Sequence, residues 1–148
     1  MRGKARGAVL SPRAPPLYTD LMQAIVLVFL GAGAGGVLRH FVNILSARWW
    51  GTDFPFGTLV TNVTGSILMG ALVGWLAFKA EANWSQPLRL FVATGILGGY
   101  TTFSTFSLET ILLIERNQIG MAAAYVGGSL LFGFLGLWGA LTIMRSLG

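Results

Sequence analysis

Four long apolar runs dominate the pattern of hydrophobic and polar positions along the chain. They cover roughly residues 23–42, 54–78, 88–114 and 119–144, and short polar segments separate them. A helix of about 20 residues crosses the hydrocarbon core of a bilayer, and each run reaches that length. The alternation typical of membrane strands is absent. The pattern therefore predicts an all-α membrane protein with four transmembrane helices.

The composition supports a membrane location. Of the 148 residues, 54% are hydrophobic and 10% are charged, whereas soluble domains carry about 25% charged residues. The absence of cysteine excludes disulfides, thiolate catalysis and zinc–sulfur sites. The net charge of +5 does not indicate a nucleic-acid partner, because the basic residues lie at the amino terminus or flank the apolar runs.

The first 21 residues differ from the rest, with four basic residues and three prolines. This composition favours a disordered cytoplasmic extension ahead of a channel domain at residues 22–148. A start site placed too far upstream, with Met22 as the true beginning, is a second interpretation. A signal peptide is a third, but its basic region would be unusually long and proline-rich.

Basic residues are almost balanced between the two predicted membrane faces. Leaving the extension aside, one face has three and the other has three: Lys79, Arg89 and Arg145 against Arg39, Arg48 and Arg116. A chain without a positive-inside bias can insert in both orientations. The basic extension, if translated, would favour one of them.

Two features resemble catalytic or cofactor motifs but have simpler interpretations. Residues 31–36 (GAGAGG) contain a dinucleotide-binding pattern, yet no strand–helix–strand unit surrounds it. Close helix packing through small residues explains it better, and it also explains Gly70, Gly74, Gly133 and Gly136. His40 is the sole histidine, so neither a metal site nor a catalytic triad is predicted and the chain does not look like an enzyme.

Polar residues inside the second run need an explanation, because polar groups are costly in a membrane. Thr58, Asn62 and Ser66 are spaced four residues apart and share one helix face. They either form hydrogen bonds between helices or line a path. The amide of Asn62 can donate hydrogen bonds that replace water around a small anion.

The third run contains Gly98, Gly99, Thr101 and Thr102 near its centre, which predicts a third helix broken near its middle. A break at membrane depth survives only where the backbone lines a cavity or is buried in protein. In transport proteins, such breaks use backbone carbonyls to bind cations and helix N-termini to favour anions.

After the predicted break, Phe103 and Phe106 share a face beside a polar stripe of Thr102, Thr105 and Glu109. The rings either belong to the bundle core or turn their positive edges toward an anion. In the fourth run, Tyr125 and Ser129 share a face and either pair across the bundle or line a path. Four helices are too few to enclose a wide aqueous pore, so two copies are expected to associate.

These segments resemble the Fluc (CrcB) family of fluoride channels over about residues 23–145. Residues 98–107 (GGYTTFSTFS) with Glu109 carry the resemblance, supported by residues 57–62 (GTLVTN) and by residues 31–36 with Arg39. The resemblance implies a passive, highly selective fluoride channel that protects cells from fluoride. It also implies a cell-membrane homodimer of antiparallel (dual-topology) subunits with two pores, surrounded by lipid.

The resemblance also assigns roles to individual positions. Phe103 and Phe106 match pore phenylalanines whose ring edges face the ion, and Asn62 matches an asparagine that coordinates fluoride. With the polar stripe, the predicted pore residues are Asn62, Phe103, Phe106, Thr58, Ser129, Tyr125, Thr102, Thr105 and Glu109. Gly133 departs from the pattern, because some members carry a second pore serine there.

A sodium ion is the one expected cofactor, and the resemblance alone implies it. Gly98 and Thr101 match positions whose backbone carbonyls hold a central sodium shared by both subunits. A proton-coupled multidrug antiporter of four helices is the main alternative function, but it requires an acid in the first helix, where residues 24–42 have none. A structural subunit of a larger complex is a third, and it leaves the break beside paired phenylalanines unexplained.

Overall fold

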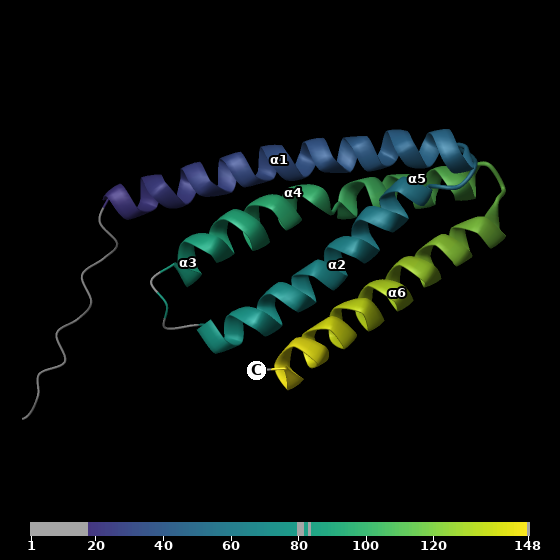
Figure 1. Ribbon diagram of the computed structural model, residues 1–148. Helices are drawn as coiled ribbons and strands as arrows, with labels where there is room; N and C mark the ends of the chain where they lie inside the picture. Colours follow the sequence, from purple (N-terminus) through teal and green to yellow (C-terminus); the bar gives the residue numbers. More distant parts are fainter. Residues whose placement is uncertain (1–17, 80–81, 83, 148) are drawn as a thin grey trace, which may run out of the picture.

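The computed structural model describes residues 18–79, 82 and 84–147, and all regular structure in this part of the chain is helical. The elements are α1 (Tyr18–Trp50), α2 (Phe56–Leu76), the 3₁₀ turn η1 (Ala77–Lys79), α3 (Ser85–Leu88), the π-helical η2 (Arg89–Leu97), α4 (Gly98–Tyr100), α5 (Phe103–Glu115) and α6 (Ile119–Ser146). Figure 1 shows α1, α2 and α6 as long rods, with α3 and α4 lying along α1.

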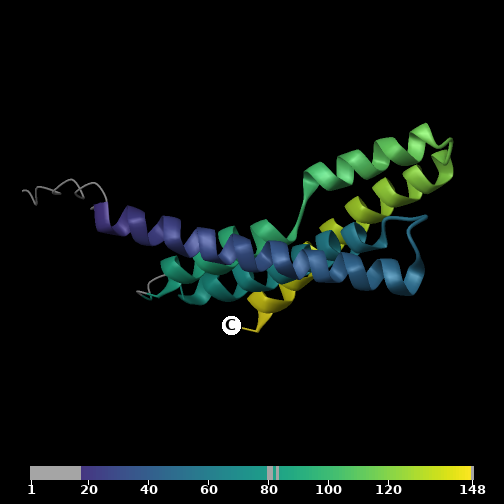
Figure 2. The same ribbon diagram turned by 90° about the horizontal axis from the view of Figure 1, so that it is seen from above.

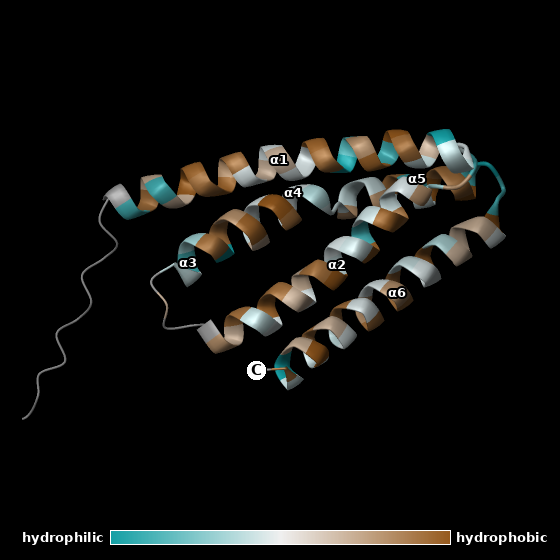
Figure 3. Ribbon diagram, in the orientation of Figure 1, coloured by the Kyte–Doolittle hydropathy of each residue, from teal (hydrophilic) through white to brown (hydrophobic). Residues whose placement is uncertain are grey.

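Among the described residues, three helices are long and apolar enough to cross a membrane: Asp20–Trp50, Phe56–Leu76 and Ile119–Ser146. Their outward faces carry large apolar side chains, among them Phe29, Phe134 and Trp138, which are 75%, 71% and 66% exposed. Figure 3 shows the polar colour mainly at helix ends and connections. Such a surface suits lipid and is unsuited to water.

The first helix is longer than the sequence predicted. The first apolar run was expected to end at residue 42, but α1 continues to Trp50. Nothing between these positions breaks a helix, and Arg48 in the last turn interacts favourably with the helix dipole. The helix stops at Gly51, which has a φ of +80° and donates its N–H to the Ala47 carbonyl at 3.0 Å.

At its other end, α1 begins at Tyr18, inside the segment predicted to be a disordered extension. Residues 1–17, which hold the rest of that segment, lie outside the described residues. The second and fourth helices have bounds within about two residues of the predicted ones, an ordinary difference at frayed helix ends.

Glycines on α1 allow it to pack closely on the segment before α5. A Cβ atom at Gly31 would overlap the carbonyl oxygen of Phe91, and one at Gly35 would overlap that of Ile96. Gly33, on another face of α1, has open space around it. The dinucleotide-like pattern is therefore a packing surface, as the small-residue interpretation predicted.

The helices α2 and α6 pack in the same way. A Cβ atom at Gly70 would overlap the carbonyl oxygen of Leu137, and one at Gly74 would lie 2.7 Å from the Cβ of Met144. From α6, a Cβ at Gly136 would lie 2.6 Å from Ile67. These contacts bring the two backbones together without large side chains between them.

The segment from Ser85 to Glu115 is divided at Thr101 and Thr102, whose backbones are extended with ψ of 158° and 120°. Before this point, η2 and α4 pack on α1. Beyond it, α5 and the first part of α6 diverge together from the other helices, as Figure 2 shows. The extended pair therefore changes the direction of the chain between two helical halves.

We expect Gly35→Ala to lower the stability of the protein while Gly33→Ala does not. Both changes improve helix propensity by about 1 kcal/mol, but only the methyl group at Gly35 meets backbone atoms. Overpacking of this kind costs about 1–3 kcal/mol. The midpoint of thermal unfolding in mild detergent tests the difference, and equal midpoints for the two variants would contradict this packing.

Candidate functional site

The side chain of Asn62 on α2 holds the extended backbone between α4 and α5. Its Oδ1 accepts the N–H of Thr102 at 2.8 Å, and its Nδ2 donates to the carbonyl oxygen of Thr102 at 3.1 Å. One amide thus satisfies both backbone groups of a residue outside any helix. Such satisfaction is required because unpaired backbone groups are costly away from water.

The hydroxyl of Thr102 then starts α5. Its Oγ1 accepts the N–H of Thr105 at 3.2 Å, which is the usual hydrogen bond of a helix N-cap. The same Oγ1 lies 3.1 Å from the hydroxyl of Thr105 and 3.2 Å from that of Ser104. Two predicted pore residues, Thr102 and Thr105, therefore form the start of α5, and Thr102 is the one bonded to Asn62.

A cavity of about 300 Å³ opens beside Asn62, and we call it the central cavity. Its lining includes predicted pore residues from α2, α5, α6 and the extended backbone: Asn62, Thr102, Phe103, Phe106 and Ser129. Only one of the two hydrogens on Asn62 Nδ2 has a partner among the described residues. The buried Oγ of Ser129 has none there. The central cavity therefore has hydrogen-bond donors to offer.

Glu109 joins α2, α5 and α6 at a point one helical turn before Asn62 on α2. Its Oε1 accepts the hydroxyl of Thr58 at 3.0 Å, and its Oε2 accepts the hydroxyl of Tyr125 at 2.7 Å. Thr58 and Tyr125 are 1% and 0% exposed. These bonds tie α5 to both α2 and α6.

Aromatic rings separate the Glu109 hydrogen bonds from the central cavity. The rings of Phe106 and Tyr125 have centroids 5.1 Å apart, and those of Phe103 and Phe106 have centroids 5.9 Å apart. Phe106 packs on the buried cluster of Leu113, Ala122 and Tyr125, whereas Phe103 is 79% exposed. Phe106 is thus partly a core residue, whereas most of the Phe103 side chain is exposed.

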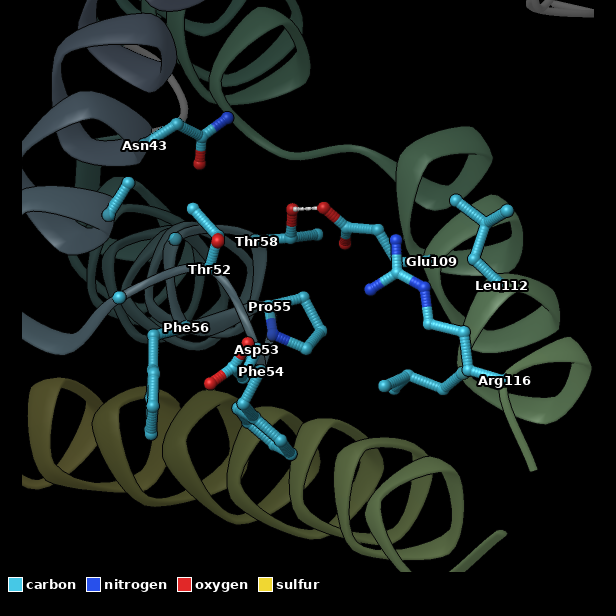
Figure 4. Close-up of a pocket in the computed structure, with 14 residues that line it drawn as sticks. Asn43, Thr52, Asp53, Phe54, Pro55, Phe56, Thr58, Glu109, Leu112 and Arg116 are labelled. Carbon is cyan, nitrogen blue, oxygen red and sulfur yellow. Dashed lines mark hydrogen bonds between the residues drawn. The ribbon is translucent and has the colours of Figure 1, made fainter. Parts of the chain in front are cut away.

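A second cavity, of about 250 Å³, lies at the end of the molecule where α1 turns into α2, and we call it the end cavity. Figure 4 shows its wall, with Thr58 and Glu109 joined by their hydrogen bond. Asn43 lines it from α1 and Arg116 from the end of α5. The sequence analysis missed both residues as lining of a cavity.

The polar face of α2 runs from one cavity to the other. Thr58 lines the end cavity, and Asn62 and Ser66 line the central cavity. A Cβ atom at Gly133 would lie 3.6 Å from the Ser66 hydroxyl, which donates to the Asn62 carbonyl at 2.8 Å. Gly133 lacks the serine hydroxyl that some family members carry, but the Ser66 hydroxyl of α2 lies close to this position.

The carbonyls of Gly98 and Thr101 have the character that a sodium site needs. The N–H of Thr102 would be the helical donor to the Gly98 carbonyl, but it donates to Asn62 instead. The Thr101 carbonyl accepts only a long bond of 3.4 Å from Arg39, and a carbonyl oxygen has a second lone pair. Uncharged oxygens at the end of a helical half fit a cation of this class.

Comparison with known proteins assigns the family. A family model described as "CrcB-like protein, Camphor Resistance (CrcB)" matches residues 26–141. The chain belongs to the CrcB family. A relative from Nitrobacter hamburgensis, named "Fluoride-specific ion channel FluC 2", is 54% identical over 122 residues, which cover 82% of this chain and 97% of the relative.

Two further relatives carry the name "Fluoride-specific ion channel FluC". The one from Rhodopseudomonas palustris is 51% identical over 122 residues, which cover 82% of this chain and 97% of the relative. The one from Beijerinckia indica is 52% identical over 126 residues, which cover 85% and 99%. Together with the apolar helices, membership of this CrcB family identifies a multi-pass membrane protein.

We expect Tyr125→Phe to destabilise the protein, because it removes one of the two hydrogen bonds to Glu109 and keeps the ring packing. Hydrogen bonds between membrane helices contribute roughly 0.5–2 kcal/mol. Thermal unfolding in detergent measures the change. The control is Thr142→Val, whose hydroxyl bonds only within α6, to the Trp138 carbonyl. A Tyr125→Phe protein as stable as the control variant would show that this bond does not hold α5.

Proposed function

We propose that the protein is a passive, highly selective fluoride channel, not an enzyme, that lets fluoride leave the cell and so limits its toxicity. It belongs to the CrcB family, and relatives 54% and 52% identical are named fluoride-specific ion channels. The observation that carries the proposal is a pair of donors at the central cavity that lack partners among the described residues: the second hydrogen of Asn62 Nδ2 and the hydroxyl of Ser129.

These donors suit a small, strongly hydrated anion. An N–H from Asn62 and an O–H from Ser129 replace part of its water shell, and the N-terminus of α5 adds the positive end of a helix dipole. The described lining of the central cavity contains no cationic side chain. The ion is therefore held weakly enough to leave again, as conduction requires.

Phenylalanine rings supply the remaining contacts in this proposal. The edge of a phenyl ring is positive and its face is negative. Phe106 lies between the central cavity and Tyr125, so an ion moving along the polar face of α2 passes its ring. Ring edges attract an anion without a full charge, and a narrow passage favours fluoride over larger halides.

Thr58, Glu109 and Tyr125 form the next part of the path in this proposal. The hydroxyl groups of Thr58 and Tyr125 both donate to the Glu109 carboxyl group. When an anion arrives, either hydroxyl can turn its hydrogen from Glu109 to the ion. The carboxyl group thus keeps the donors in place between passages.

Two copies would complete the pore. Phe103 is 79% exposed beside the central cavity, and a second subunit is the natural cover for it. We propose a homodimer in which Ser85–Glu115 forms the third, interrupted span of each chain. The near balance of basic residues between the two faces supports antiparallel, dual-topology subunits.

Sodium would join the two subunits at their interruptions. Gly98 and Thr101 would hold it through their backbone carbonyls, and the bound ion supplies positive charge beside an anion path. The cationic side chain of Arg39 also donates a hydrogen bond to the Thr101 carbonyl oxygen.

No fuel is required for this function. Fluoride enters cells as its neutral acid, dissociates at the higher internal pH and is trapped as the anion. A negative-inside potential then drives the anion outward by about 2.3 kcal/mol per 100 mV.

We predict that Asn62→Ala and Phe106→Ile each reduce fluoride efflux about tenfold or more, which corresponds to about 1.4 kcal/mol of lost stabilisation. The protein is reconstituted in liposomes with a potassium gradient, and a fluoride electrode records efflux after addition of valinomycin. The wild type should release fluoride rapidly without a proton gradient.

The control for these variants is Phe41→Ile, which alters an exposed phenylalanine of α1 outside both cavities. It should conduct like the wild type. Wild-type liposomes that retain fluoride would refute the proposed function, and proton-coupled movement of an organic cation would support an antiporter. Normal efflux through both site variants would remove Asn62 and Phe106 from the pore.

We predict that replacing all sodium by N-methyl-D-glucamine weakens the dimer, because a bulky organic cation does not fit between backbone carbonyls. Size-exclusion chromatography at decreasing protein concentration measures the dimer–monomer equilibrium in each salt. A dimer that persists equally in both salts would exclude a structural sodium ion.

A further inference from the structure

The end cavity is lined by both signs of charge, unlike the central cavity. Arg116 and Asp53 line it, and the Glu109 carboxyl group lies at the inner end beside Thr58. Figure 4 shows Arg116 extending into the cavity from the end of α5, with Asp53 near Pro55. Arg116 is its one cationic lining residue among those described.

The wall of the end cavity also contains a buried hydrogen-bond acceptor on Asn43. The Oδ1 of Asn43 is buried and has no donor among the described residues. A Cβ atom at Gly57 would overlap this oxygen, so the glycine at that position leaves room for the Asn43 amide. The cavity beside it, of about 250 Å³ and lined by polar and charged groups, has room for water.

An anion that reaches Thr58 through the end cavity first passes acidic groups. Asp53 is exposed at the cavity, and Glu109 lies at its inner end. Without a cation, both would repel a fluoride ion in a space where bulk water screens charge incompletely. Arg116, also exposed, offsets this repulsion at the point where the ion leaves the aqueous phase.

We propose that the end cavity is a hydrated vestibule of the fluoride path and that Arg116 sets the rate at which anions reach Thr58. Arg116 acts by its charge and does not belong to the narrow part of the pore. This inference rests on the proposed function, because the anion that it attracts is fluoride. Charge lining a cleft raises the local concentration of an oppositely charged ion, and salt removes the effect.

The experiment measures the initial rate of fluoride efflux at limiting fluoride and at two ionic strengths. At about 0.01 M the Debye length is about 30 Å, and at about 1 M it is about 3 Å. At low salt, Arg116→Gln should reduce efflux about threefold or more, and the difference from wild type should shrink at high salt. Arg116→Lys should conduct within about twofold of wild type, and Asp53→Asn should conduct faster than wild type at low salt.

Arg48→Gln is the matched control, because Arg48 is an exposed arginine at the same end of the molecule that does not line the cavity. It should retain efflux within about twofold of wild type. Equal loss in Arg48→Gln and Arg116→Gln would overturn the vestibule in favour of general surface charge.

Three other results bear on the proposal. A loss in Arg116→Gln that is the same at both ionic strengths, or no loss, would overturn the role of its charge, as would failure of Arg116→Lys to conduct. Size-exclusion chromatography verifies that each variant is folded, and Asp53→Asn tests the charge effect independently of Arg116. Wild-type vesicles that are tight to fluoride would instead refute the proposed function itself.

Discussion

The paired hydrogen bonds between Asn62 and the backbone of Thr102 are the interaction on which the rest of the site depends. A residue outside any helix leaves its N–H and carbonyl unpaired, which costs several kcal/mol per group in a bilayer. The Asn62 side-chain amide carries a donor and an acceptor, as a peptide group does. It therefore pairs with both the N–H and the carbonyl of Thr102. The chain can therefore change direction there, and this change gives α5 its own course and creates the central cavity.

The interruption works because the helices around it are held by a different kind of contact. Lipid provides no hydrophobic driving force between helices, so close backbone packing through small residues carries much of their association. Gly31 and Gly35 fix α1 on the segment before the interruption, and Gly70 and Gly74 fix α2 on α6. Against this frame, α5 is attached by the hydrogen bonds of Glu109 and by the packing of Phe106 and Leu113 against Tyr125 of α6.

The sequence was sufficient to predict the long helices and the shared helix face of Thr58, Asn62 and Ser66, because apolar runs and four-residue spacing are local properties. It placed the end of α1 too early, at residue 42, whereas the helix continues to Trp50 and Asn43 within it lines the end cavity. It did not predict the π-helical turn of η2.

The hydrogen bonds of Glu109 and the end cavity also lay beyond the sequence. They join residues from separate helices, such as Thr58, Tyr125 and Arg116, and no local pattern specifies that proximity. The sequence feature that could have identified Asn43 as a cavity residue is its polar side chain among mostly apolar neighbours. The roles of Gly98 and Thr101 as sodium ligands stay a prediction that came from family resemblance.

Amide hydrogen exchange at Thr102, measured by NMR on the protein in lipid nanodiscs, tests the central interaction most directly. If Asn62 holds the interrupted backbone, the Thr102 N–H exchanges slowly, as amides inside the helices do, and Asn62→Ala makes it exchange rapidly. A Thr102 N–H that exchanges in the wild type as fast as the exposed loop at Thr52 would contradict the account.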